Sequence, residues 1–462
     1  MGARVPHGHR RLTRRPSAHL PRAHPLAEIA VATTRPDSLS AWLAHLEQVH
    51  PRGIDMGLAR VSAVADRLAL RPPAPLCFVV GGTNGKGSTT TAIEHVLRAR
   101  GLRVGATFSP HLVRFNERIH LDGAEVSDAL LCAAFDAIET ARAEITLTYF
   151  EFGMLAALWC FREARVDAAV IEVGLGGRLD AANIVDADVA VITTIGLDHM
   201  DYLGPDRASI AREKAHIARA GRPLVVGEPE PPDSLLEVAA AIGARVIRRG
   251  DVASGFAINA TADGFAYCGP TRTLHCAVQT PLILDNVGTA LAALEAAGAL
   301  PDERTLAQAL ADARIAGRIQ RVDARVPVYV DVAHNPHGAH FLAAAMSEPA
   351  RQVGGRTHIV LGTLADKDRE GIVAALAPLA SCWWLASTRG ERSLAAEALA
   401  GTVRADASNR PGVGDNAAVS SHANLAAALG AALAAAHEGD RILVCGCFQV
   451  AADALDVLGA AR

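Results

Sequence analysis

The sequence lacks any uninterrupted apolar run of about 18 residues, the length that marks a membrane-spanning helix. An alanine-rich segment over 425–436 is too short to cross a bilayer. The chain also lacks an excess of positive charge, because 45 Lys and Arg stand against 49 Asp and Glu, for a net charge of -4. We therefore expect neither a membrane nor a nucleic acid as a partner.

The sequence also lacks Cys-x-x-Cys pairs among its eight cysteines, which have no histidine-rich tract beside them. This pattern indicates buried thiols in a reducing cytosol, so we expect a cytoplasmic protein.

The length and composition indicate a folded chain with several domains. Half of the 462 residues are hydrophobic and 20% are charged, which predicts an ample core divided between two or three domains. Residues 1–36 differ, with seven arginines, a single acid, Glu28, and no apolar segment typical of a secretory signal. We expect this segment to be a disordered tail or the result of a start site placed too early, with an organellar transit peptide as the alternative. The fold is expected to begin at Asp37, the N-cap of a helix.

The central feature of the sequence is the stretch over 76–91. Residues 76–80 are apolar and β-prone, glycines follow at 81, 82, 85 and 87, and a helix is expected from Ser88. Glycines allow backbone N–H groups to surround an anion, and a helix N-terminus adds partial positive charge. Lys86 would neutralise nucleotide phosphates, and the Ser88 hydroxyl would bind Mg²⁺. A glycine-rich β-turn with a fortuitous lysine is the alternative.

The loop departs from the general Walker spacing because a glycine separates Lys86 from Ser88. It resembles instead the ATP-binding loop of the Mur ligase superfamily and, within it, of the folylpolyglutamate and dihydrofolate synthases. The resemblance extends over about residues 37–458. It implies that ATP is bound by eight residues of the loop, namely Gly82, Thr83, Asn84, Gly85, Lys86, Gly87, Ser88 and Thr89.

Two further loops follow buried strands. The strand predicted over 167–172 ends in Glu172, and the strand over 188–194 leads to His199. Because the carboxyl ends of parallel strands meet at one edge of a sheet, both side chains are expected beside the phosphate loop. Imidazole is an unusual Mg²⁺ ligand, and a structural histidine is the alternative. The resemblance implies that Ser88, Glu172 and His199 bind Mg²⁺.

A predicted helix over 206–220 contains Arg212-Glu213-Lys214. This segment resembles one in which the family's lysine is carbamylated by CO₂ and binds a second metal ion. The resemblance implies the same for Lys214. An unmodified lysine paired with Glu213 or with a phosphate is the alternative.

A proline-anchored loop at 109–119 contains an aromatic residue and two arginines. Such a loop can stack on a flat heterocycle and pair with carboxylates, and a solvated basic loop is the alternative. The loop resembles the family's contact with the pteroate part of the substrate. The resemblance implies a folate-binding set of Asp55, Ser109, Pro110, His111, Arg114, Arg178 and Asp180, to which we add Phe152 as a residue that could face the pocket. A loop that caps the next helix is the alternative for Asp55, and a position in the core is the simplest interpretation of Phe152.

The last third of the chain again alternates strands with helical patterns. Strands are predicted over 328–332, 359–362, 383–386 and 442–445, which indicates a second, smaller doubly wound domain. The resemblance implies that Asn286 meets adenine and that Arg318 reaches the ATP phosphates from across the domain junction. A helix N-cap at Asp285 or Asn286 is the alternative to the adenine contact. Asp331 suits a contact with ribose or nucleotide, and His334 a substrate carboxylate or phosphate, with an Asn-Pro turn as the alternative.

We therefore predict an α/β, Mur-ligase-like protein. A P-loop ATPase domain with a parallel-sheet core and folate-binding loops would span 37–317, and a smaller Rossmann-like glutamate-ligase domain 318–462. The resemblance implies a monomeric ATP-dependent ligase that uses ATP and two Mg²⁺ ions to join L-glutamate to dihydropteroate, a folate or both, through an acyl phosphate. Lys86, Lys214, His199, Arg318 and His334 would take part in catalysis. A cell-wall Mur ligase and a nucleotide-dependent switch without catalysis are the alternatives.

Overall fold

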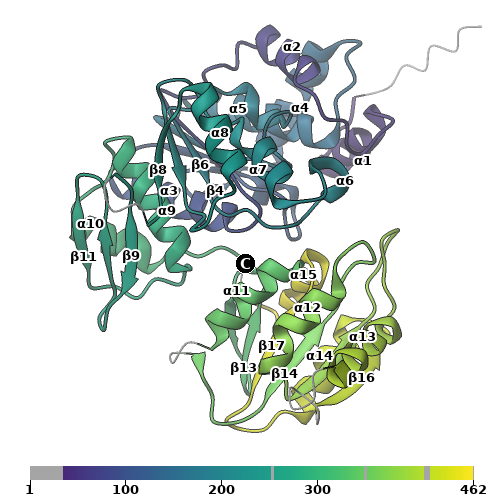
Figure 1. Ribbon diagram of the computed structural model, residues 1–462. Helices are drawn as coiled ribbons and strands as arrows, with labels where there is room; N and C mark the ends of the chain where they lie inside the picture. Colours follow the sequence, from purple (N-terminus) through teal and green to yellow (C-terminus); the bar gives the residue numbers. More distant parts are fainter. Residues whose placement is uncertain (1–34, 251–253, 348–350, 410–416, 461–462) are drawn as a thin grey trace, which may run out of the picture. The chain divides into compact units, whose positions relative to one another are not determined.

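Strand β1 (Leu76–Gly81), which precedes the phosphate loop, lies inside an eight-stranded sheet (Figure 1). The computed structural model describes residues 35–250, 254–347, 351–409 and 417–460, so the prediction for the N-terminal tail falls almost entirely outside the described residues. The strand order is β4-β3-β2-β5-β1-β6-β7-β8. The six strands from β2 to β8 in this order are parallel, and β3 and β4 form an antiparallel hairpin at one edge. The other strands of this sheet are β2 (Val104–Thr107), β3 (Ile119–Leu121), β4 (Ala124–Glu125), β5 (Ala168–Glu172), β6 (Val189–Ile192), β7 (Pro223–Val226) and β8 (Arg245–Arg248).

The register of the central strands positions the site. Val80 on β1 pairs with Glu172 at the end of β5, and Gly81 pairs with Ile192 at the end of β6. The phosphate loop, Glu172 and the loop that leads to His199 therefore leave the sheet at the same edge, as the sequence predicts.

Side chains of β1 alternate between two cores. Cys77 and Val79 pack in one core with α1, α2, α4, α5, α7 and α8, whereas Phe78 and Val80 pack in the other with α3, α9 and α10. This alternation follows from the two-residue period of a strand and requires helices on both faces, because the strand is buried throughout. The helices are α1 (Leu39–Val49), α2 (Ala59–Arg67), α3 (Lys86–Ala99), α4 (Asp128–Arg142), α5 (Tyr149–Ala164), α6 (Met200–Leu203), α7 (Arg207–Ala215), α8 (Asp233–Ile242), α9 (Leu284–Ala296) and α10 (Glu303–Ala311).

A second sheet follows Gly317, with the order β12-β13-β17-β14-β15-β16. Its strands are parallel except for the edge strand β12, which is antiparallel to β13. Its four predicted strands are confirmed with small shifts at their ends as β13 (Pro327–Val330), β14 (Thr357–Leu361), β15 (Cys382–Ala386) and β17 (Arg441–Cys445). Helices α11 (Pro336–Met346), α12 (Arg369–Leu376), α13 (Ala396–Asn409), α14 (Leu425–Ala435) and α15 (Phe448–Val457) accompany it. Alternate residues of β17 again divide between two cores, with Leu443 in one and Val444 in the other. The predicted α/β, Mur-ligase-like class is confirmed.

Several strands were not predicted individually from the sequence. The edge strands β12 (Gln320–Asp323) and β16 (Ala418–His422) are mostly polar and partly exposed, so they lack a strong apolar signal. A three-stranded antiparallel sheet also forms from β9 (Ala257–Ala260), β10 (Phe265–Cys268) and β11 (Thr273–Cys276). Each of its strands has four residues and buries only about half of them, which is too short a pattern to predict a strand.

Helix α7 corrects another prediction, because it ends at Ala215 and not at Ala220. The ring Nδ1 of His216 lies 2.7 Å from the carbonyl of Arg212, to which it donates a hydrogen bond. This bond satisfies a carbonyl at the end of the helix that would otherwise lack a partner. Among the described residues, no helix is both long and apolar enough to cross a membrane.

Candidate active site

The phosphate loop joins β1 to α3 through glycines that residues with a side chain cannot replace. Gly82 and Gly85 have φ values of 140° and 84°, in the region that side chains rarely adopt. A Cβ at Gly82 would overlap Thr193, and a Cβ at Gly85 would overlap the side-chain amide of Asn286. The loop is therefore fixed by its own backbone and by close neighbours from β6 and α9.

All three lysines of the chain, Lys86, Lys214 and Lys367, line one cavity of about 640 Å³, which we call the reaction cavity. The remaining basic residues are 42 arginines, which is the total of 45 Lys and Arg less three. The chain therefore uses the compact ammonium group of lysine only at this cavity and the guanidinium group elsewhere.

Of these lysines, Lys214 is buried and Lys86 is half-buried. The Nζ of Lys86 donates to the carbonyls of Gly82 and Thr83, at 3.1 and 3.2 Å, and the Nζ of Lys214 donates to the Gly82 carbonyl at 3.0 Å. Burial, reinforced by the charge of Lys86, lowers the pKa of Lys214 to about 7. Part of the Lys214 population is therefore a neutral amine near neutral pH.

Glu172 and His199 line the same cavity. Burial raises the pKa of Glu172 to about 7, despite the charges of Lys86 and Arg318. Its carboxylate accepts a long hydrogen bond, of 3.4 Å, from the backbone N–H of Ser109. Burial also lowers the pKa of His199 to about 4, so its ring is neutral and has a nitrogen lone pair near neutral pH. A buried carboxylate short of donors beside a neutral imidazole fits a divalent cation. No group of three or more His, Cys, Asp and Glu side chains with metal-binding geometry occurs in the described part of the chain.

A second cavity lies beside the phosphate loop and shares Asn84, Gly85, Arg318 and His334 with the reaction cavity. We call it the nucleotide cavity. Its lining includes Ser88, Asn286 and Asp331. The Asp331 carboxylate accepts from the backbone N–H groups of Ile319 (2.8 Å) and Ala333 (2.7 Å). Thr89 is fully buried in α3 and is not among the residues that line either cavity.

The fold thus brings most of the predicted ATP and metal residues together around these two cavities. Gly82, Thr83, Lys86, Gly87 and Lys214 line the reaction cavity, and Arg318 and His334 line both. Arg318 is half-buried, and its guanidinium lies 5.3 Å from the centre of the Phe448 ring.

A third cavity, of about 300 Å³, is lined by aromatic and apolar side chains and is called here the aromatic pocket. It shares Ser109, Pro110, Gly174, Leu175 and His199 with the reaction cavity. Asp55 and Asp180 of the predicted folate-binding set also line it, whereas His111 lines the reaction cavity instead.

Three of the predicted folate-binding residues lie elsewhere. Arg114 is exposed and pairs with Glu125 and Asp128, while Arg178 is exposed and pairs with Glu213 at 2.9 Å. Phe152 is fully buried in the core of the first sheet. The structure therefore does not bring these three side chains to the aromatic pocket.

The pocket contains other side chains that the sequence analysis did not select, among them Arg118, Tyr149, Phe150 and Glu151. The Arg118 guanidinium lies 5.7 Å from the centre of the Tyr149 ring and donates to the Nδ1 of His111 at 2.7 Å. Glu151 is 4% exposed and accepts from Arg60 at 3.1 Å. The sequence offered one sign of these residues, the aromatic pair at the start of α5. Its meaning becomes clear in the structure, where Phe150 lies against Gly174 and both line the pocket.

The arrangement is that of an ATP-dependent ligase of the Mur type, in which a phosphate loop on one sheet shares its cavities with side chains from a second sheet. Family models agree, since the Mur ligase middle domain matches residues 80–225 and the Mur ligase glutamate ligase domain matches residues 317–448. The chain belongs to the dihydrofolate synthase/folylpolyglutamate synthase family.

Individual relatives support this assignment over nearly the whole chain. The dihydrofolate synthase/folylpolyglutamate synthase of Escherichia coli is 44% identical over 425 residues, which cover 92% of this chain and 96% of that protein. The structure of E. coli FolC in complex with DHPP and ADP has a TM-score of 0.85 at 43% identity and covers 91% of this chain and 98% of its own. The structure of a bifunctional folylpolyglutamate synthase/dihydrofolate synthase with Mn, AMPPNP and L-glutamate bound has a TM-score of 0.82 at 42% identity. The match covers 92% of this chain and 100% of that chain.

Proposed function

We propose that this protein joins L-glutamate by an amide bond to dihydropteroate, to the γ-carboxylate of a reduced folate, or to both. The observation that carries the proposal is that one cavity connects two others. The reaction cavity shares Asn84 and Gly85 of the phosphate loop with the nucleotide cavity, and it shares Ser109, Pro110 and His199 with the aromatic pocket. A carboxylate substrate held in the aromatic pocket would thus meet the γ-phosphate of a nucleotide at Lys86.

The chemistry follows from the groups at that meeting point. A free carboxylate is a poor acyl donor, because attack by an amine would have to expel oxide or hydroxide. Transfer of the γ-phosphoryl group to the carboxylate forms an acyl phosphate and releases ADP, and the glutamate amine then displaces phosphate and loses a proton. Lys86 and Arg318 would stabilise the charge on the transferred group, so catalysis would rest mainly on positioning and electrostatics.

Divalent metal fits the donor set of the reaction cavity. Glu172 and His199, with Ser88 from the nucleotide cavity, would hold the ion, which would neutralise phosphate charge when bound. We infer two Mg²⁺ ions, with Lys214 as a ligand of the second after carbamylation. The neutral fraction of the Lys214 amine, which its pKa of about 7 provides, supports this modification. In that step the amine nitrogen bonds to the carbon of CO₂ and releases a proton, which leaves an anionic carbamate.

The aromatic pocket supports a flat heterocyclic substrate. Tyr149 and Phe150 supply ring faces, Arg118 supplies a cation, and Asp180 is buried at the base of the neighbouring loop. Burial raises the pKa of Asp180 to about 6, and its two oxygens accept from the backbone of Leu175 and Ala182. Asp180 therefore shapes the loop that lines the pocket.

We further infer a division of labour along the chain at Arg318, with the nucleotide-binding part over 37–317 and the glutamate-handling part over 318–462. The second sheet, which begins at β12 three residues after Gly317, supports this boundary. We also infer a cytoplasmic monomer that acts on small molecules.

The test is ADP release by the purified protein with MgATP and L-glutamate, with dihydropteroate and tetrahydrofolate supplied in parallel and the product identified by mass. Turnover with either substrate supports the proposal, and turnover with both establishes a bifunctional enzyme. ADP release that requires a cell-wall precursor, or no release with any substrate, would overturn it.

A matched pair of arginines tests the aromatic pocket. Arg118→Met is expected to raise KM for the pteroate substrate at least ~10-fold, because the lost cation faces the pocket. Arg114→Met is the control, since Arg114 lies on the same loop but pairs with surface carboxylates, and it should change KM less than ~2-fold. Equal effects of the two changes would contradict the assignment of the pocket.

A further inference from the structure

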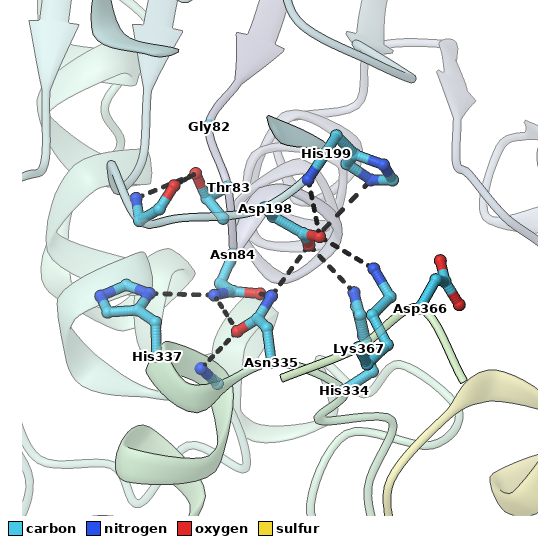
Figure 2. Close-up of polar contacts among 12 residues, drawn as sticks. Gly82, Thr83, Asn84, Asp198, His199, His334, Asn335, His337, Asp366 and Lys367 are labelled. Atoms are coloured by element: carbon cyan, nitrogen blue, oxygen red, sulfur yellow. Dashed lines mark hydrogen bonds and ion pairs between the residues drawn. The ribbon is translucent and has the colours of Figure 1, made fainter. Parts of the chain in front are cut away.

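One buried carboxylate in the reaction cavity holds groups from three different segments of the chain. Asp198 lies in the loop after β6, and 9% of its side chain is exposed. Its Oδ1 accepts from the Nζ of Lys367 at 2.8 Å and from the backbone N–H of His199 at 3.0 Å. Its Oδ2 accepts from the side-chain amide of Asn335 at 3.0 Å and lies 3.3 Å from the Nε2 of His334 (Figure 2).

These partners come from the carboxyl ends of strands in both sheets. His334 and Asn335 follow β13, Lys367 lies in the loop after β14, and His199 follows β6. Figure 2 shows all of them converging on the one carboxylate. The loop of the first sheet is therefore tied to two loops of the second at the wall of the reaction cavity.

Asp198 holds the side chains of Lys367 and His334. The Lys367 side chain is 11% exposed, and its Nζ pairs with the Asp198 carboxylate. The Nδ1 of His334 lies 2.9 Å from the carbonyl of Val332, and its Nε2 faces Asp198, so these two contacts fix the orientation of the ring.

Asn335 extends the same network to the phosphate loop. Its Oδ1 accepts from the backbone N–H of Gly338 at 2.7 Å, which caps α11, and from the Asn84 side-chain amide at 3.1 Å. The Asn84 amide also lies 2.9 Å from the Nδ1 of His337. The side chain of Asn84 is thus engaged by residues after β13, while its backbone remains part of the nucleotide-binding loop.

His199 is positioned by the same carboxylate. Its φ is 51°, which is uncommon for a residue with a side chain, and its backbone N–H donates a hydrogen bond to the Asp198 carboxylate. A single side chain thus fixes the backbone of a candidate metal ligand, the ammonium group of Lys367 and the ring of His334.

We propose that Asp198 is a positioning residue of the ligase reaction, which holds Lys367 and His334 against the reaction cavity so that both can face the anionic substrates. This inference rests on the proposed function, because it assigns a part to Asp198 in that reaction. Lys367, the third of the chain's lysines, becomes the cation that Asp198 orients. Without Asp198 a buried cation would lose its partner and the two sheets would lose their shared contact.

The experiment is a double-mutant cycle with Asp198→Asn and Lys367→Met. Each single change is expected to lower kcat/KM for L-glutamate about 100-fold, and the double variant should fall less than ~3-fold below the worse single variant, because both remove the same interaction. ADP affinity, measured by calorimetry, should change less than ~3-fold, since Arg318 and Asn286 are untouched. Asp201→Asn is the control, because it is the same chemical change three residues away on an exposed position, and it should leave kcat/KM unchanged.

The outcomes separate this inference from the proposed function. A wild-type protein that is inactive with every pteroate substrate would count against the proposed function. An active wild type whose Asp198→Asn variant stays within ~3-fold of it would overturn the role of Asp198, as would losses that multiply in the double variant. If Asp198→Asn does not fold, the Lys367→Met variant tests the proposal by itself. A folded Lys367→Met variant with normal kcat/KM would overturn the proposal.

Discussion

Replacing Lys214 with methionine should stabilise the protein while it abolishes ligase activity. Lys214 is 5% exposed, its ammonium group donates a hydrogen bond to the Gly82 carbonyl, and its neighbour Lys86 is also a cation. Methionine has a similar length and no charge to desolvate. The change removes a buried cation that ligase activity requires but whose burial lowers the stability of the folded protein.

The magnitude follows from the pKa of this lysine. A fall from 10.5 to about 7 represents a penalty of about 5 kcal/mol on folding, at ~1.4 kcal/mol per pKa unit. Loss of the hydrogen bond to Gly82 offsets about 1 kcal/mol, and local relaxation offsets more, so we expect a net gain of about 3 kcal/mol. With an unfolding entropy of about 2 cal/mol/K per residue, a chain of this size should melt roughly 3 °C higher.

The gain should depend on pH in a defined direction. Because the folded pKa lies below the unfolded one, the penalty in the wild type is fully present below pH 7 and disappears as the pH rises towards 10.5. The difference between Lys214→Met and wild type should therefore be largest at pH 6.5 and shrink by about 1.4 kcal/mol per pH unit above pH 7.

The assay is thermal unfolding at pH 6.5, 8 and 9 in CO₂-depleted buffer with EDTA, so that the wild-type side chain is a free amine. Lys214→Arg is the control, because it retains a buried charge and should show no gain. A Lys214→Met variant that is less stable than wild type at pH 6.5, or a gain that does not change with pH, would refute the reasoning.

Three further predictions concern the loop, the core and the small sheet. Gly85→Ala should weaken ADP binding at least ~10-fold in calorimetry, because its Cβ would overlap Asn286, whereas Gly101→Ala, at a similar φ of 81° but with no atom near its Cβ, should leave affinity unchanged. Phe150→Ala should raise KM for the pteroate substrate with little loss of stability, whereas Phe152→Ala should cost about 3–5 kcal/mol in denaturant unfolding and change KM little. Tyr267→Phe should destabilise the protein by about 1–2 kcal/mol without changing kcat, because it removes the 2.7 Å bond to Glu295 in a region that lines neither cavity of the site. Unchanged ADP affinity in Gly85→Ala, a larger KM effect for Phe152→Ala than for Phe150→Ala, or a loss of kcat in Tyr267→Phe would contradict the respective assignments.

Much of the architecture could be predicted because it depends on local patterns. The buried strands before Gly81, Glu172 and Thr193 are apolar throughout, and a parallel sheet necessarily opens their carboxyl ends on one edge. The phosphate loop was predictable for the same reason, since its glycines, lysine and helix start are adjacent in sequence. The short or exposed strands β9 to β12 and β16 were not predictable, because too few of their residues are buried to produce a pattern.

The sequence by itself therefore determined the fold class, the phosphate loop and the edge of the sheet at which Lys86, Glu172 and His199 gather. Only the tertiary structure decided which side chains face each cavity. Phe150 and Phe152 lie two residues apart on one helix, so they point in different directions, and only packing places Phe150 in the aromatic pocket and Phe152 in the core. Likewise, Asp198 gains its partners from residues 137 and 169 positions away, because the loops of two separate sheets meet there, and no local pattern encodes that meeting.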